Sequence, residues 1–147
     1  MRLSLQVRYA ICGLFDLAYN GRSEPVQVRI VGERQRIPAR YLEQIFQRLR
    51  RARLVSGKRG PGGGYVLARP PEEISLRDIL EALEGPRAQW FAGPDSVPVP
   101  YRPEFLWPRM AGQVSAALAD TTLAGMCREA ARSSVRRAGD DEHMYFI

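Results

Sequence analysis

The sequence predicts a mainly α-helical protein that carries one small β-hairpin. Two amphipathic helix patterns follow each other between residues 28 and 51, and two short apolar runs then flank a glycine-rich turn. The first seventy residues are also strongly basic. Helix, turn, helix and hairpin in this order are typical of a winged helix-turn-helix DNA-binding domain, and a further long helix pattern follows it.

Charge is distributed unevenly along the 147 residues. Residues 1–70 contain fourteen Lys and Arg against four acids, whereas residues 71–147 contain eight Arg against twelve acids. A basic half that coincides with the helix-turn-helix indicates a polyanionic partner. Nearly all of these cations are Arg, whose planar fork binds phosphate and guanine better than Lys does.

The first helix is expected from Ser4, a suitable N-cap, to Asn20. Its apolar surface comes from Leu5, Tyr9, Cys12, Leu14, Phe15 and Leu17. Asn20-Gly21 ends it, and after the turn at Glu24-Pro25 a short helix from Val28 to Gln35 forms the first half of the helix-turn-helix.

The second helix of the unit starts after Pro38, which suits a helix start because it lacks an N–H. Leu42, Ile45, Phe46 and Leu49 recur at the spacing of an apolar face, together with Tyr41. The opposite face carries long donors and acceptors: Arg40, Glu43, Gln44, Gln47, Arg48 and Arg51. Such side chains can bind base edges in the major groove, although a surface helix with a charge bias is the alternative.

The glycine-rich turn from Lys58 to Tyr65 places Lys58 and Arg59 beside Gly60, Pro61 and three further glycines, where the backbone can approach a partner closely. A phosphate-binding loop of the Walker type would end in Gly-Lys-Ser/Thr and lead into a helix, but this turn leads into Tyr65-Val66-Leu67. We interpret it as a wing. The predicted DNA-binding set is Arg36, Pro38, Arg40, Tyr41, Glu43, Gln44, Arg48, Arg51, Lys58, Arg59, Gly60 and Gly62.

Four segments are expected: a DNA-binding domain at 1–85, a loop rich in proline and aromatic residues at 86–103, a long helix with a short final helix at 104–138, and a mobile tail at 139–147. Ser75 caps a helix that runs through Leu83 and stops at Gly85. The long helix begins near Pro103 or Glu104. It contains small residues such as Ala116, which allow another helix to approach closely.

Over half of the chain, from Met1 to about Gly85, resembles the Rrf-two family of bacterial winged-helix regulators, which includes IscR, NsrR and CymR. The resemblance rests on Met1-Arg2-Leu3-Ser4, Arg8-Tyr9-Ala10, Glu33-Arg34-Gln35, Tyr41-Leu42-Glu43-Gln44, Arg59-Gly60-Pro61-Gly62-Gly63-Gly64-Tyr65 and Ile79 to Gly85. It implies a homodimeric repressor or activator that binds a palindromic operator in double-stranded DNA. The second helix would lie in the major groove, the wing in the minor groove, and the long helix would form the dimer.

The sequence departs from the family in three places. Arg36 and Arg53 stand where members usually have Gly, and a left-handed backbone there would cost on the order of 1 to 2 kcal/mol. The interval from Gly85 to Leu106 lacks the three cysteines with which IscR-like members hold an iron–sulfur cluster. Cluster irons need thiolate or imidazole ligands, so we predict a protein without a cluster or other metal cofactor.

Aromatic and charged residues replace those cysteines: Trp90, Phe91, Tyr101, Arg102, Glu104, Phe105 and Trp107. Three interpretations stay open at this point. The aromatics form a packed mini-core, they line a pocket for a small organic anion as effector, or they dock a protein co-regulator.

The remaining residues argue against other classes of protein. His143 is the only histidine, so no catalytic or metal-binding set can be assembled, and we expect no enzyme. Cys12 and Cys127 lie among apolar helical residues, where inert buried thiols are expected; a thiol switch or an unconventional cluster using them is the alternative. No apolar run approaches the ~18 residues of a membrane span, so we expect a cytoplasmic protein. A winged helix used only for protein assembly is the remaining rival.

Overall fold

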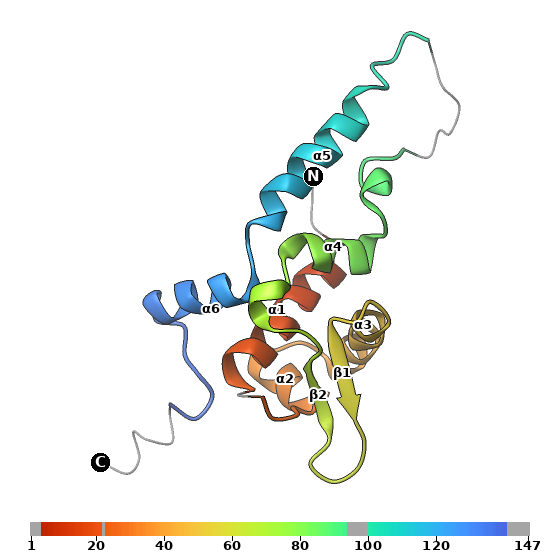
Figure 1. Ribbon diagram of the computed structural model, residues 1–147. Coiled ribbons are helices and arrows are strands. Elements are labelled where there is room, and N and C mark those ends of the chain that lie inside the picture. The colour runs from red at the N-terminus through yellow and green to blue at the C-terminus, as the bar shows by residue number, and fades with distance from the viewer. Residues whose placement is uncertain (1–3, 22, 94–99, 141–147) are drawn as a thin grey trace.

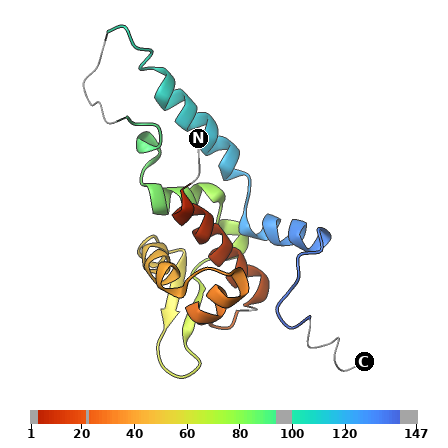
Figure 2. The same ribbon diagram turned by 180° about the vertical axis from the view of Figure 1, so that it is seen from behind.

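The computed structural model describes residues 4–21, 23–93 and 100–140. It has the winged helix-turn-helix fold that the sequence predicts, followed by a projecting helix (Figures 1 and 2). In chain order its elements are α1 (Leu5–Asn20), α2 (Val28–Gln35), α3 (Ala39–Arg51), β1 (Val55–Lys58), β2 (Gly64–Leu67), η1 (Pro71–Glu73), α4 (Leu76–Glu84), η2 (Arg87–Gln89), α5 (Leu106–Ala119) and α6 (Leu123–Arg132).

Helix α1 is the centre of the body, and it contacts α2, α3, α4, α6 and β2. The Ser4 hydroxyl accepts a hydrogen bond from the Val7 N–H at 3.2 Å, which confirms the predicted N-cap. Val7 and Leu14 have no exposed surface and join Phe46 of α3 in the main core cluster. The apolar face of α1 therefore sets the positions of the elements around it.

The hairpin pairs β1 and β2 antiparallel, from Val55 opposite Leu67 to Lys58 opposite Gly64. The Tyr65 ring stacks on Phe46 with ring centroids 4.9 Å apart, which attaches the root of the wing to α3. Val26 and Tyr65 exchange backbone hydrogen bonds of 3.0 and 2.8 Å. The chain between α1 and α2 is thus fastened to the wing as well.

Helix α4 begins with a capping box. The Ser75 hydroxyl accepts from the Asp78 N–H, and the Asp78 carboxylate accepts from the Ser75 N–H. Gly85 ends the helix with a φ of 84°, so both predicted ends are confirmed.

Helix α6 packs against α1 and η1, and Leu123 is buried in the same core cluster as α1. Its start is tied to the start of α4 by two backbone hydrogen bonds of 2.9 Å, from Leu76 N–H to Thr121 O and from Leu123 N–H to Ile74 O. The sequence pattern predicts α6 in one segment with the long helix. Its packing instead attaches it to the body formed by the first 85 residues.

Helix α5 projects from the body as an arm (Figures 1 and 2) and contacts α4 and η2. It begins at Leu106, two to three residues later than expected, because the preceding residues form a turn in which the Leu106 N–H donates to Pro103 O at 3.0 Å. His143 and most of the predicted tail lie outside the described residues.

Candidate nucleic-acid interface

Helix α3 buries one face and exposes the other. Leu42, Ile45, Phe46 and Leu49 are buried with at most 3% of their surface exposed. The polar side chains predicted to bind DNA lie on the exposed face, namely Arg40, Tyr41, Glu43, Gln44 and Arg51. Arg40 also contacts Tyr41, with its guanidinium carbon 4.9 Å from the ring centroid and a 3.2 Å hydrogen bond to the phenol oxygen. The start of α3 thus presents a connected pair of long donors.

Arg48 departs from its predicted place in the DNA-binding set. Its guanidinium donates to the Gln6 side chain at 2.7 Å and to the Leu83 carbonyl at 2.5 Å. It therefore connects α3 to α1 and α4, and its guanidinium is engaged within the body. The spacing of Arg48 on α3 could not show this, because its partners lie 42 and 35 residues away in the sequence.

The wing presents its cations at the surface. Lys58 and Arg59 are exposed, as are the turn residues Gly60 and Gly62. Gly60 and Gly62 have φ angles of 87° and 74° and open space where a side chain would lie. A backbone with this freedom can approach a partner closely. Strand β1 contacts α3, so the wing lies beside this helix (Figure 1).

A buried carboxylate that the sequence pattern did not reveal positions α2 on α1. Asp16 is fully buried and accepts hydrogen bonds from the Arg34 Nε at 3.1 Å, the Gln35 amide at 3.1 Å and the Asn20 amide at 3.3 Å. The second guanidinium nitrogen of Arg34 also forms a 2.5 Å ion pair with it. The signal available in the sequence was an acid, Asp16, between the apolar residues Leu14 and Leu17 of α1.

Arg36 and Arg53 both adopt left-handed backbone conformations, with φ of 55° and 61°. Family members usually have glycine at both positions, so the left-handed backbone considered from the sequence is confirmed. Each costs on the order of 1 kcal/mol for a residue with a side chain. Arg36 is exposed in the turn before α3, where its charge can face a phosphate.

The described residues of the aromatic segment differ in how far they are buried. Trp90 is half-buried against the core, and its indole N–H donates to the Gly85 carbonyl at 3.0 Å. Tyr101, Phe105 and Trp107 are 97%, 65% and 39% exposed. The Trp107 indole donates to Glu104 at 3.2 Å. Phe91 is half-buried and Arg102 is exposed. The mini-core interpretation thus suits Trp90, whereas Tyr101, Phe105 and Trp107 face outward.

The two cysteines are both half-buried free thiols. Burial raises the pKa of the Cys12 thiol against the opposing effect of Arg8, and burial likewise raises that of Cys127 against Arg137 and Arg128. A raised pKa disfavours the reactive thiolate, in agreement with inert thiols. Among the described helices, none is long and apolar enough to cross a membrane.

A helix-turn-helix with an exposed polar second helix beside a basic wing defines the class of winged helix-turn-helix DNA-binding proteins. Comparison with known proteins narrows the class. The model of the family described as "Rrf2: Iron-dependent Transcriptional regulator" matches residues 3–129, and the chain belongs to this family. Family members are transcriptional regulators and not enzymes.

Two curated relatives match over half of this chain. The chain is 52% identical over 86 residues to the HTH-type transcriptional regulator IscR of Cereibacter sphaeroides, which covers 57% of this chain and 56% of the relative. It is 43% identical over 84 residues to IscR of Escherichia coli O1:K1 / APEC, covering 57% of this chain and 52% of the relative. The chain therefore spans about half the length of the curated relatives it matches.

Two solved structures are similar over nearly their whole length. T. potens IscR has a TM-score of 0.75 and 30% identity, covering 99% of this chain and 96% of that chain. CymR (YrzC), the global cysteine regulator of B. subtilis, has a TM-score of 0.72 and 31% identity, covering 88% and 98%. The family and the fold expected from the resemblance are thus confirmed.

The family description names iron, but the residues of this chain do not fit an iron–sulfur cluster. No cysteine occurs between Gly85 and Leu106, and no group of three or more His, Cys, Asp or Glu that could hold a metal ion is found among the described residues. Glu104 is engaged with Trp107. Cluster irons need thiolate or imidazole ligands, and this segment offers neither.

Proposed function

We propose that this protein is a sequence-specific, homodimeric transcription regulator that binds palindromic double-stranded DNA in the cytoplasm. The observation that carries the proposal is the exposed polar face of α3 beside the basic wing. Arg40, Glu43 and Gln44 have the donors and acceptors that distinguish bases in the major groove. Lys58 and Arg59 supply the phosphate or minor-groove contacts of the wing.

The projecting arm supports dimerisation. One side of α5 is covered by the body, with Ala111 and Ser115 at most 2% exposed. On its other side Ala116 is exposed, and a side chain added at Gly112 would meet nothing within 4 Å. An arm with small residues open to the surroundings suits a second helix at close range. A two-fold dimer also accounts for binding to two half-sites.

The exposed aromatics of the 90–107 segment fit a protein surface better than a small-molecule pocket. Tyr101, Phe105 and Trp107 lie at or before the start of the arm and expose large apolar area. Aromatic side chains are enriched in protein interfaces. We assign this segment to contact with the second subunit or a protein co-regulator. Repression or activation then depends on where the operator lies.

Selection of bound sequences from random DNA, followed by binding assays at several salt concentrations, tests base recognition. Glu43→Ala should relax the preference at one base pair per half-site, with each specific contact worth about 1 to 3 kcal/mol. Glu81→Ala, which removes an exposed acid from α4, is the matched control and should leave the selected sequence unaltered. Identical selected sequences for Glu43→Ala and the unaltered protein would remove Glu43 from the reading face.

The wing is tested by Arg59→Gln. If Arg59 binds a phosphate, affinity falls at all sites and the salt dependence decreases by about one unit; if it enters the minor groove, sites with a narrow groove weaken selectively. A protein-assembly module without a DNA function would show no salt-dependent binding to any sequence.

Dimerisation is tested by Ala116→Glu, which places a charge on the open side of α5 and should give monomers in sedimentation. Ala131→Glu places the same charge on the exposed surface of α6 and should leave the dimer intact. If the Ala116→Glu protein sediments as an unaltered dimer, α5 is not the interface.

A further inference from the structure

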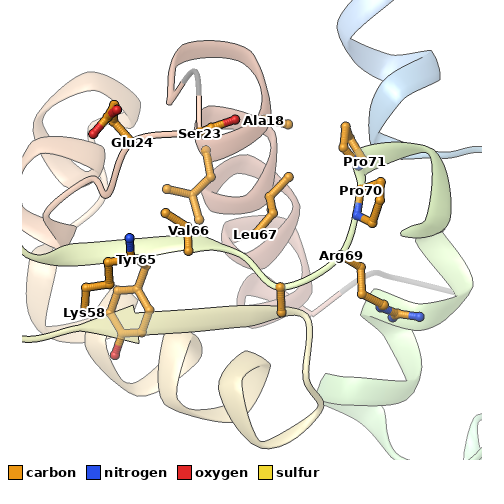
Figure 3. Close-up of a pocket in the computed structure, with 12 residues that line it drawn as sticks. Ala18, Ser23, Glu24, Lys58, Tyr65, Val66, Leu67, Arg69, Pro70 and Pro71 are labelled. Atoms are coloured by element: carbon orange, nitrogen blue, oxygen red, sulfur yellow. The ribbon is translucent and has the colours of Figure 1, made fainter.

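A crevice of about 460 Å³ lies between the end of α1, the turn before α2 and strand β2 (Figure 3). Its apolar wall comes from Ala18 on α1, from Val66 and Leu67 on β2, and from Pro70 and Pro71 in the segment that follows. The volume falls within the range of small-molecule sites, and such sites combine an apolar wall with a few placed charges. None of the predicted effector residues lines this crevice.

Charged residues lie at the two ends of the crevice. Figure 3 places Lys58 and Glu24 toward one end and Arg69 toward the other. Lys58 and Glu24 carry opposite charges, so their end has little net charge. Arg69 lies at the other end. The Asp78 carboxylate is 3.8 Å from its terminal nitrogen, beyond hydrogen-bond distance, so an anionic group can compete for the guanidinium there.

Arg69 does not use all of its hydrogen-bond donors. Its terminal nitrogen lies 3.8 Å from the Asp78 carboxylate, which is too far for a hydrogen bond. Its Nε is buried and has no hydrogen-bond partner among the described residues. A buried donor without a partner is unfavourable, and an arginine fork matches a carboxylate. In Figure 3 the guanidinium points away from the crevice, so this partly exposed side chain must rotate toward the crevice to bind a carboxylate.

We propose that the crevice binds a small organic monocarboxylate with an apolar body. The carboxylate lies at the Arg69 end, and the apolar body lies against Ala18, Val66 and Leu67. The ligand would contact the turn before α2 and the wing strand together. These two segments join through Val26 and Tyr65, so occupancy changes how the wing sits beside the helix-turn-helix. This regulatory consequence rests on the proposed DNA-binding function, whereas ligand binding does not.

The probe is 2-naphthoate, with 2-naphthamide as the neutral analogue of nearly the same shape. Calorimetric titration of the full chain should show one site per chain for 2-naphthoate. 2-Naphthamide should bind about tenfold more weakly, as expected for a charge-assisted hydrogen bond. Arg69→Gln should weaken 2-naphthoate by a similar factor. Arg87→Gln, at an exposed arginine of η2 away from the crevice, should bind as the unaltered chain does.

Equal binding of the acid and the amide, equal binding by Arg69→Gln, or absence of binding overturns the site. The comparison of the two ligands uses the unaltered protein, so it decides even if Arg69→Gln fails to fold. DNA affinity is then measured by fluorescence anisotropy with and without saturating 2-naphthoate. A change of at least threefold that Arg69→Gln abolishes supports regulation, and an unaltered affinity overturns it. A chain that binds 2-naphthoate but no DNA would refute the proposed function and keep the site.

Discussion

Replacing Asp16 by Asn tests whether the buried carboxylate holds the helix-turn-helix in place. The substitution keeps the size of the side chain but removes its charge and replaces one acceptor oxygen by an N–H₂ donor. That donor would face Arg34, Gln35 or Asn20, which themselves donate to Asp16 in the structure. Arg34 would lose its ion pair as well.

The structure allows the cost to be bounded. Removing one partner of a buried ion pair costs about 3 to 5 kcal/mol when the remaining charge stays buried. Asp16 is fully buried, but the Arg34 side chain is 26% exposed and can be partly hydrated. We therefore expect a loss of about 2 to 3 kcal/mol in the free energy of unfolding. For a chain of this size the melting temperature should fall by roughly 6 to 9 °C.

Urea denaturation of the variant and of a matched control measures this loss. Arg29→Ala breaks the ion pair between Arg29 and Glu33 on α2, where both side chains are about 65% exposed. An exposed pair at this spacing contributes about 0.3 to 0.5 kcal/mol, so Arg29→Ala should lower the free energy of unfolding by no more than that. A cycle with Arg34→Gln should give a coupling energy above about 1 kcal/mol. A loss below about 0.5 kcal/mol for Asp16→Asn, equal to the control, would refute the positioning role.

Three further predictions concern the backbone, the thiols and the missing ligands. Arg36→Gly should raise the free energy of unfolding, measured in urea, by about 1 kcal/mol, because glycine adopts the left-handed conformation without strain. Arg51→Gly within α3 should lower the free energy of unfolding by about as much. If both variants are destabilised, the strain argument is contradicted. Burial raises the pKa of Cys12 and Cys127, so less of either thiol should be ionised at pH 7 than in an unperturbed cysteine. Modification by a disulfide reagent should therefore be slow at pH 7 and should accelerate as the pH rises toward the raised pKa. Rapid modification at pH 7 would contradict this. Protein prepared without oxygen should be colourless and still bind DNA, because the 86–105 segment offers no thiolate to a cluster. If the preparation contains stoichiometric iron and sulfide, and both disappear in Cys12→Ala, the protein has an unconventional cluster site.

Local signals determined much of the fold from the sequence alone. The Ser4 cap, the Ser75 cap, the glycine at position 85 and the apolar spacing of α3 each act within a few residues. Hydrogen bonds and periodicities over so short a range depend little on the rest of the chain. For this reason the bounds of α2 and the identity of the wing followed from the sequence, and the resemblance to the family followed from the same residues.

The tertiary structure decided which side chains stabilise the body and which remain available to a partner. Arg48 and Asp16 find their partners 42 and 18 residues away, and α6 returns to the body through Leu123. The outward position of Tyr101 and the crevice beside Arg69 depend likewise on how separate elements pack. Helix spacing identifies the face on which a residue lies. Only the packing of distant elements determines what that face contacts, because their relative positions come from the whole core.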